Sequence, residues 1–186
     1  MENDPHKPRI LILNYPSNPV GSTYNTQQLK DFVRVLKKYN IIVISDEIYG
    51  LLNHSGQHNS LATLYPEKTI ISSGISKWCG AGGWRLGTFA FPNELSWLLN
   101  GMKVVASETF TSVSAPIQYA AVKAFEGSPA IENYLVHSRR ILSVIGNWCY
   151  QQLKQNNIRL IKPEGAFYLF PSFKNYKEKL KQIGIT

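Results

Sequence analysis

The spacing of apolar and polar positions predicts a β-α-β unit over residues 9–45. Residues 9–14 (RILILN) form a short apolar run that ends at the turn-forming sequence NYPSNPVG. Thr26 is expected to cap the next helix, whose apolar side chains recur with the period of an α-helix until Asn40. The uninterrupted apolar run at 41–45 (IIVIS) then predicts a strand that is buried on both faces, as in parallel sheets covered by helices.

The remainder of the chain predicts two more strands and then mostly helices. Short strands are expected at 69–72 and at 86–91. Three helices are expected next, beginning near Asn93, near Pro116 and after Pro129, the last of them over about 130–156. The segments IRLI and AFYLFP flank a PEG turn and predict a short strand pair, which a cationic helix follows.

This order of elements predicts an α/β fold with a mainly parallel sheet and flanking helices. The short strand pair and the final helix predict the start of a small α+β domain. The boundary is expected inside the long helix, so that residues 1–140 belong to the large domain and 141–186 to the small one. With 186 residues, of which 44% are hydrophobic, the chain is long enough for one domain and part of a second.

Composition and charge exclude several classes of function. The net charge of +8 comes from scattered basic residues without a zinc-finger or RNA-binding signature, so no nucleic acid is expected as a partner. Cys79 and Cys149 lie far apart and predict reduced thiols in a cytoplasmic protein. His54 and His58 lie four residues apart in a loop, and no metal site is expected there. No apolar run approaches the length of a membrane span, and the first ten residues lack the apolar core of a signal peptide.

Polar residues follow three of the expected strands at the edge where a parallel sheet carries its reactive groups. These segments are 14–21, 46–49 and 72–77, and the last one ends at Lys77. Arg85 follows in a second glycine-rich turn. Pyridoxal phosphate needs this combination, because it requires a lysine for a Schiff base, a carboxylate at its pyridinium nitrogen, donors to its phenolate oxygen and a cation at its phosphate. The residues therefore predict a pyridoxal-phosphate site.

The sequence resembles the class I/II aminotransferases of fold type I, the aspartate-aminotransferase-like superfamily. Four stretches carry the resemblance, in the order found in the family, and together they cover nearly the whole chain: NYPSNPVG, SDEIYG, SGISKWCGAGGWRLG and PEGAFYLFP. The resemblance implies an incomplete large domain of a pyridoxal-phosphate-dependent transferase.

The resemblance also implies roles for four residues. Lys77 would form the Schiff base and move the proton between the substrate's α carbon and the cofactor. Asp46 would keep the pyridine nitrogen protonated, so that the ring withdraws electrons. Asn18 and Tyr49 would hydrogen-bond the phenolate oxygen, and Asn18 would also contact the α-carboxylate of the substrate.

The phosphate contacts implied by the resemblance fall on Arg85 and Ser76. Many family members carry a hydroxyl residue three positions before the lysine, where this sequence has Gly74. Ser73 is the nearest substitute, so the chain departs from the family pattern at this contact.

The resemblance implies an enzyme that transfers an amino group between an amino acid and a 2-oxo acid, as a homodimer in its intact form. The phosphate loop, the stacking aromatic and the C-terminal substrate arginine of the family fall outside this sequence, so we expect the chain alone to be weakly active or inactive. Two alternatives remain at this point. One is a pyridoxal-phosphate-dependent C–S lyase or a cyclopropane-carboxylate-type synthase on the same fold, and the other is a cofactor-free binding or scaffold module.

Overall fold

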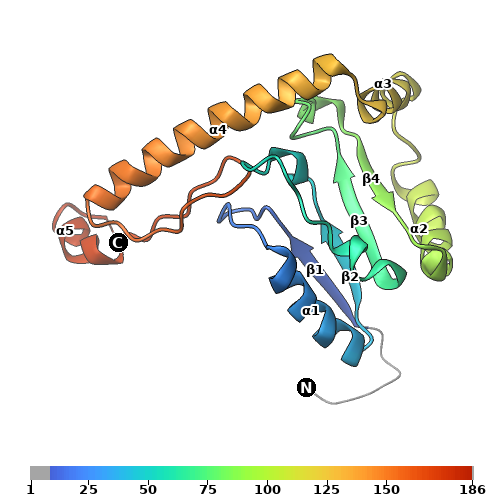
Figure 1. Ribbon diagram of the computed structural model, residues 1–186, viewed down its shortest axis with the longest axis horizontal. Coiled ribbons are helices and arrows are strands. Elements are labelled where there is room, and N and C mark those ends of the chain that lie inside the picture. Colours follow the sequence, from blue (N-terminus) through green and yellow to red (C-terminus); the bar gives the residue numbers. More distant parts are fainter. Residues whose placement is uncertain (1–8, 186) are drawn as a thin grey trace.

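The computed structural model describes residues 9–185, which contain a four-stranded sheet (Figure 1). The strands lie side by side in chain order, and the first three are parallel, whereas the fourth runs antiparallel to the third. Their bounds are Ile10–Asn14 for β1, Ile42–Asp46 for β2, Thr69–Gly74 for β3 and Gly87–Ala90 for β4. The predicted α/β fold with a mainly parallel sheet is therefore confirmed.

Residues 1–8 and 186 lie outside the described residues, and with them most of the sequence from which a signal peptide was excluded. Among the helices of residues 9–185, none combines the length and the apolar character that crossing a membrane requires.

Helix α1, Thr26–Lys38, connects the parallel strands β1 and β2. The prediction that Thr26 caps this helix is wrong, because Asn25 is the N-cap. The Asn25 side chain accepts a hydrogen bond from the Gln28 backbone at 2.9 Å, and the Gln28 side chain accepts one from the Asn25 backbone at 2.9 Å. This reciprocal capping box needs a glutamine or glutamate three positions after the cap, which Asn25 has and Thr26 lacks.

Apolar side chains cover both faces of the two central strands, β2 and β3. On one face, Leu29 and Leu36 of α1 pack with Val43 of β2. On the other face, Ile70 of β3 packs with Leu98 of α2, Ser96–Thr109. Because β2 and β3 are covered on both sides, their sequences lack the apolar–polar alternation of half-exposed strands.

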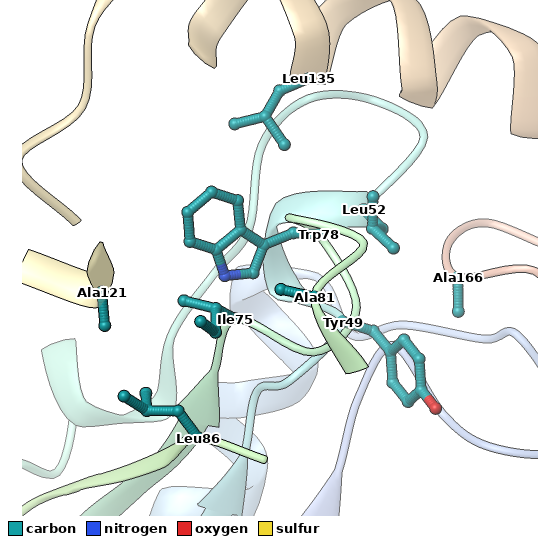
Figure 2. Close-up of a cluster of buried hydrophobic side chains, with 9 residues drawn as sticks. All are labelled: Tyr49, Leu52, Ile75, Trp78, Ala81, Leu86, Ala121, Leu135 and Ala166. Carbon is teal, nitrogen blue, oxygen red and sulfur yellow. The ribbon is translucent and has the colours of Figure 1, made fainter. Parts of the chain in front are cut away.

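Helices α3, Ala115–Glu126, and α4, Pro129–Gln155, follow, and α4 passes across the end of the sheet where β1, β2 and β3 terminate (Figure 1). A third apolar cluster fills the space between this edge and the two helices. Figure 2 shows its members, with the Trp78 indole surrounded by Ile75, Ala121 and Leu135. This cluster attaches the helices to the loops that carry the predicted site residues.

The predicted strand pair after α4 is not formed. In the described part of the chain, an isolated bridge joins Arg159 of IRLI to Ser172, the residue after AFYLFP. The segment around Gly165 instead bonds to loops that follow β1 and β2, and it makes an isolated bridge with Asn53. A short helix, α5, Lys177–Gln182, ends the described chain. Since α4 passes residue 140 without interruption, the boundary between 1–140 and 141–186 stays a prediction.

Candidate active site

The three parallel strands end side by side, and residues at or near their carboxyl ends lie at the base of the candidate site. Asn14 of β1 is paired with Asp46 of β2, and Asp46 is paired with Ser72 of β3. The polar segments that follow the strands therefore start from one edge of the sheet, as the sequence predicted.

Asp46 is a half-buried carboxylate fixed by its neighbours. The side-chain amide of Asn14 donates to Asp46 Oδ2 at 3.0 Å and to the Asp46 carbonyl at 3.2 Å. The backbone amide of Ile48 lies 3.3 Å from Asp46 Oδ1 and donates to it. Because each carboxylate oxygen has a donor, the orientation of Asp46 is set before any ligand binds.

Asn14 also shapes the turn that carries Asn18. Its side-chain oxygen accepts a hydrogen bond from the Asn18 backbone amide at 2.7 Å. The Asn18 side chain is exposed, and it lies near enough to the Tyr49 phenol to lower the pKa of that phenol by hydrogen bonding. Through Asn14, the position of Asn18 is therefore coupled to that of Asp46.

Tyr49 is only 3% exposed, and its hydroxyl oxygen lies 2.5 Å from that of Tyr168. Burial raises the pKa of the Tyr49 phenol well above its ordinary value, and the nearby Asp46 carboxylate raises it further. The Asn18 side chain acts in the opposite direction and does not cancel these effects. Tyr49 is therefore a neutral phenol at physiological pH and keeps a proton to donate.

Lys77 lies in the turn after β3, and its ammonium is 5.9 Å from the centre of the Tyr49 ring. The buried side chains of Ile75 and Trp78 flank it, and the Trp78 indole donates to the Gly74 carbonyl at 2.7 Å. These anchors hold the half-buried lysine at the carboxyl edge of the sheet. Lys77 and Tyr49 are thus in contact although 28 positions separate them in the sequence.

The turn also explains why position 74 is a glycine. A Cβ atom at Gly74 would meet the Leu86 carbonyl oxygen at 2.6 Å and the Gly87 Cα at 3.1 Å. Both contacts are with the backbone of the chain entering β4, which cannot rotate away as a side chain can. A serine at this position is therefore excluded by the close approach of β3 and β4.

Arg85 and Ser76 are less closely joined to the other predicted residues. The Arg85 backbone is left-handed, with φ of 56°, and its guanidinium donates to the Gly82 carbonyl at 2.9 Å. Its side chain is exposed, whereas Ser76 is half-buried. A Cβ atom at Gly82 would lie 3.5 Å from the Ser76 carbonyl, so the two turns lie against each other. The described contacts do not join Arg85 to Lys77.

Glu47 lies on the opposite side of the β2 terminus from Asp46, because successive side chains of an extended segment alternate in direction. Its carboxylate accepts hydrogen bonds from Ser45 at 2.8 Å, from Ser60 at 2.7 Å and from His58 Nε2 at 2.9 Å. His54 makes a separate hydrogen bond to the Ala166 carbonyl. His54 and His58 therefore each make a hydrogen bond that joins their loop to another segment of the chain.

Sequence reasoning missed two residues of this site. Asn14 was seen only as the start of a polar segment, although its place at a strand terminus was a usable signal. Tyr168 was seen only as part of the PEGAFYLFP motif, and nothing in its local sequence indicated that it reaches Tyr49. The polar groups at this edge are a carboxylate, an amine, a phenol and an amide, with the Arg85 guanidinium in the following turn, and this set fits the polar groups of pyridoxal phosphate.

Comparison with known proteins places the chain in a family. Residues 1–184 match the family described as aminotransferase class I and II. The chain therefore belongs to the class I and II aminotransferases, a family that depends on pyridoxal phosphate, and the predicted resemblance is confirmed.

Similar proteins differ in the substrates that they are named for. An aspartate aminotransferase from Geobacillus stearothermophilus is 35% identical over 170 residues, which cover 88% of this chain and 42% of the relative. A probable N-acetyl-LL-diaminopimelate aminotransferase from Bacillus subtilis is 32% identical, with coverage of 90% and 41%. The crystal structure of an aromatic aminotransferase from Pyrococcus horikoshii superimposes with a TM-score of 0.84 at 30% identity, covering 94% of this chain and 48% of that one. The chain spans less than half the length of each of these proteins.

Proposed function

We propose that this chain supplies the central part of the cofactor site of a pyridoxal-phosphate-dependent aminotransferase, which transfers an amino group between an amino acid and a 2-oxo acid. The observation that carries the proposal is the contact of Lys77 with Tyr49, next to the anchored carboxylate of Asp46. Family membership supports the same reaction. The carbon–sulfur lyase, the synthase and the cofactor-free module have no comparable observation in their favour.

In this proposal, pyridoxal phosphate supplies an aldehyde that binds amines covalently and a ring that withdraws electrons from the bound substrate. Asp46 binds the protonated ring nitrogen. Because Asn14 and the Ile48 backbone already hold both carboxylate oxygens, Asp46 needs little reorganisation to make this ion pair.

Tyr49 and Asn18 donate hydrogen bonds to the phenolate oxygen of the cofactor. Tyr49 suits this role because its buried phenol stays protonated at physiological pH. Asn18 is more exposed, and in this proposal its amide would contact the carboxylate of an incoming amino acid as well. The identity of that amino acid is left open by the different substrates named for similar proteins.

Lys77 would hold the cofactor through its side-chain amine. The same amine is the group that would move a proton between the substrate's α carbon and the product. Arg85 would pair with the cofactor phosphate, and Ser76 would add a hydrogen bond from the neighbouring turn.

The test is an absorbance spectrum in the near-ultraviolet and visible range after pyridoxal phosphate is added and the excess is removed. The chain should show a band that borohydride reduction abolishes, and Lys77→Ala should lack it. Lys103→Ala, which removes an exposed lysine of α2, is the matched control and should keep the band. A band of equal size in Lys77→Ala would overturn the assignment of the Schiff-base lysine.

Turnover should be measured with a longer protein that includes the segments which relatives have and this chain lacks. Amino transfer that depends on Lys77 would support the proposed reaction. Release of ammonia and pyruvate without a 2-oxo acid would instead identify a lyase.

A further inference from the structure

Tyr168 is a half-buried tyrosine to which the proposed reaction assigns no role. Its hydroxyl oxygen lies 2.5 Å from that of Tyr49, and the two rings meet edge to face with centroids 5.4 Å apart. Phe167 packs edge to face on the same Tyr49 ring, with centroids 5.6 Å apart. The PEGAFYLFP segment thus contacts both the ring and the hydroxyl of a predicted cofactor ligand.

The segment that carries Tyr168 is held by hydrogen bonds to the two loops that carry Asn18 and Tyr49. The backbone amides of Glu164 and Gly165 donate to the Gly21 carbonyl at 2.8 and 3.1 Å. The Ala166 amide donates to the Leu52 carbonyl at 3.1 Å, and the Ala166 carbonyl lies 3.0 Å from His54 Nε2. These bonds fix the backbone on both sides of the site.

Ala166 gives a second indication that this geometry is enforced. It is fully buried and has a left-handed φ of 56°, a conformation that residues with a Cβ atom seldom adopt. Such strain persists only where the surrounding structure determines the backbone, and it is concentrated at functional sites. The turn therefore delivers Tyr168 to one position beside Tyr49.

We propose that Tyr168 is a positioning residue that donates its hydroxyl proton to Tyr49 and so directs the Tyr49 proton toward the phenolate oxygen of the cofactor. A phenol has one proton, so within this pair one hydroxyl donates to the other. When Tyr168 donates, the Tyr49 proton is left for a third group. An anionic oxygen next to Tyr49 selects this arrangement, because only then does it receive a hydrogen bond.

The arrangement makes a chain of two hydrogen bonds that ends on a negative charge. In such a chain each bond polarises the next, so the Tyr49 hydroxyl becomes a better donor when Tyr168 donates to it. The cofactor-directed part of this inference rests on the proposed function. The pairing of the two tyrosines is a property of this chain alone, and it can be tested without a cofactor.

The first experiment measures the pair without a cofactor, by NMR of the chain labelled with 13C at the tyrosine Cζ positions. The Tyr49 signal is assigned from its loss in Tyr49→Phe. In Tyr168→Phe this signal should shift, because the hydrogen bond between the two hydroxyls is gone. Tyr176→Phe is the matched control, since it also removes a hydroxyl with a 2.5 Å hydrogen bond, to Asn156, away from the site. An unchanged Tyr49 signal in Tyr168→Phe would overturn the proposal.

The second experiment follows the pH dependence of the lysine-dependent absorbance band with bound pyridoxal phosphate. Weaker donation to the phenolate oxygen should move the midpoint of this titration upward in Tyr168→Phe, by about one pH unit or less. In a Tyr49→Phe background, Tyr168→Phe should cause no further shift, because it acts through Tyr49. An equal shift in that background would contradict a positioning role.

The two experiments separate this inference from the proposed function. If neither the unchanged chain nor any variant forms the lysine-dependent absorbance band, the proposed function fails for this chain. The cofactor-directed role of Tyr168 then fails with it. The NMR shift then still decides whether the two tyrosine hydroxyls are paired in this chain. Thermal unfolding of each tyrosine variant confirms that the fold is kept, since tyrosine to phenylalanine retains the packed ring.

Discussion

Replacing Glu47 with glutamine should lower the free energy of unfolding by about 2 to 3 kcal/mol near neutral pH. The Glu47 carboxylate is 9% exposed and accepts hydrogen bonds from Ser45 and Ser60 at one oxygen and from His58 at the other. A glutamine oxygen can keep the two serine hydrogen bonds. Its NH₂ group faces His58 Nε2, so the imidazole must either lose this partner or change tautomer.

The change of tautomer carries its own cost in this site. His58 Nδ1 is buried and has no hydrogen-bond partner within residues 9–185. A proton moved to Nδ1 would therefore be a buried, unpaired donor, which costs about 1 to 3 kcal/mol. Both outcomes, a lost charge-assisted hydrogen bond or an unpaired donor, give a destabilisation of the size stated above.

The pH dependence of this destabilisation follows from the Glu47 pKa. Burial raises this pKa, but hydrogen bonds from His58, Ser60 and Ser45 lower it more, so it lies below its ordinary value. A carboxyl group with a lowered folded-state pKa stabilises the fold above its unfolded pKa of about 4.3. This stabilisation is lost as the pH falls through the folded-state pKa. The difference between the parent and Glu47→Gln should therefore shrink below about pH 4.

The assay is urea unfolding followed by circular dichroism at a series of pH values. Glu67→Gln is the matched control, because Glu67 is 40% exposed and lies 3.6 Å from the Lys37 ammonium. An exposed pair of this kind contributes about 0 to 1 kcal/mol, so the control should change little. A Glu47→Gln effect that is as small as the control, or that is constant from acidic to neutral pH, would refute the reasoning.

Three further substitutions test the packing around the site. Asn25→Ala should destabilise the chain by about 1 kcal/mol in urea unfolding, because it removes the cap of α1, whereas Asn25→Ser should restore most of it. Leu135→Ala should cost about 2 to 5 kcal/mol, since Leu135 is 2% exposed and joins α4 to the cluster around Trp78; an effect below 1 kcal/mol would contradict this burial. Gly165→Ala should release the PEGAFYLFP segment, because its Cβ atom would lie 2.6 Å from Pro16 Cγ. Limited proteolysis should then cut near Gly165, and an unchanged digest would count against the contact.

The sequence predicted the elements that local patterns determine. The apolar runs of β1, β2 and β3 and the periodic helices α1 to α4 lie within a few residues of their predicted bounds, because apolar periodicity and the turn residues that end a strand are local properties of the sequence. The N-cap of α1 was placed on Thr26 instead of Asn25, although the Gln28 signal of a capping box was present in the sequence. The predicted pairing of IRLI with AFYLFP failed because the backbone around Gly165 bonds to loops far earlier in the chain.

The predicted site residues were brought together to different degrees. Asp46, Tyr49, Lys77 and Asn18 lie near one another because parallel strands end at a common edge, a rule that sequence order alone can use. Their catalytic roles, those of Arg85 and Ser76, and the homodimeric state and cytoplasmic location stay predictions. Tyr168 was missed because a contact with Tyr49 across 119 positions depends on how the last part of the chain docks, and no local pattern encodes that.

This separation along the chain also sets the order of events during synthesis. A ribosome adds about 5 to 20 residues per second, so the 119 positions between Tyr49 and Tyr168 take about 6 to 24 s to appear. The β1-α1-β2 unit is complete by Asp46 and can form early, since its contacts are close in sequence. The hydrogen bond between Tyr49 and Tyr168 therefore cannot form until the PEGAFYLFP segment has left the ribosome. Nascent chains stalled before Gly165 should therefore contain the folded unit, while the paired tyrosines form only in chains released beyond Tyr168.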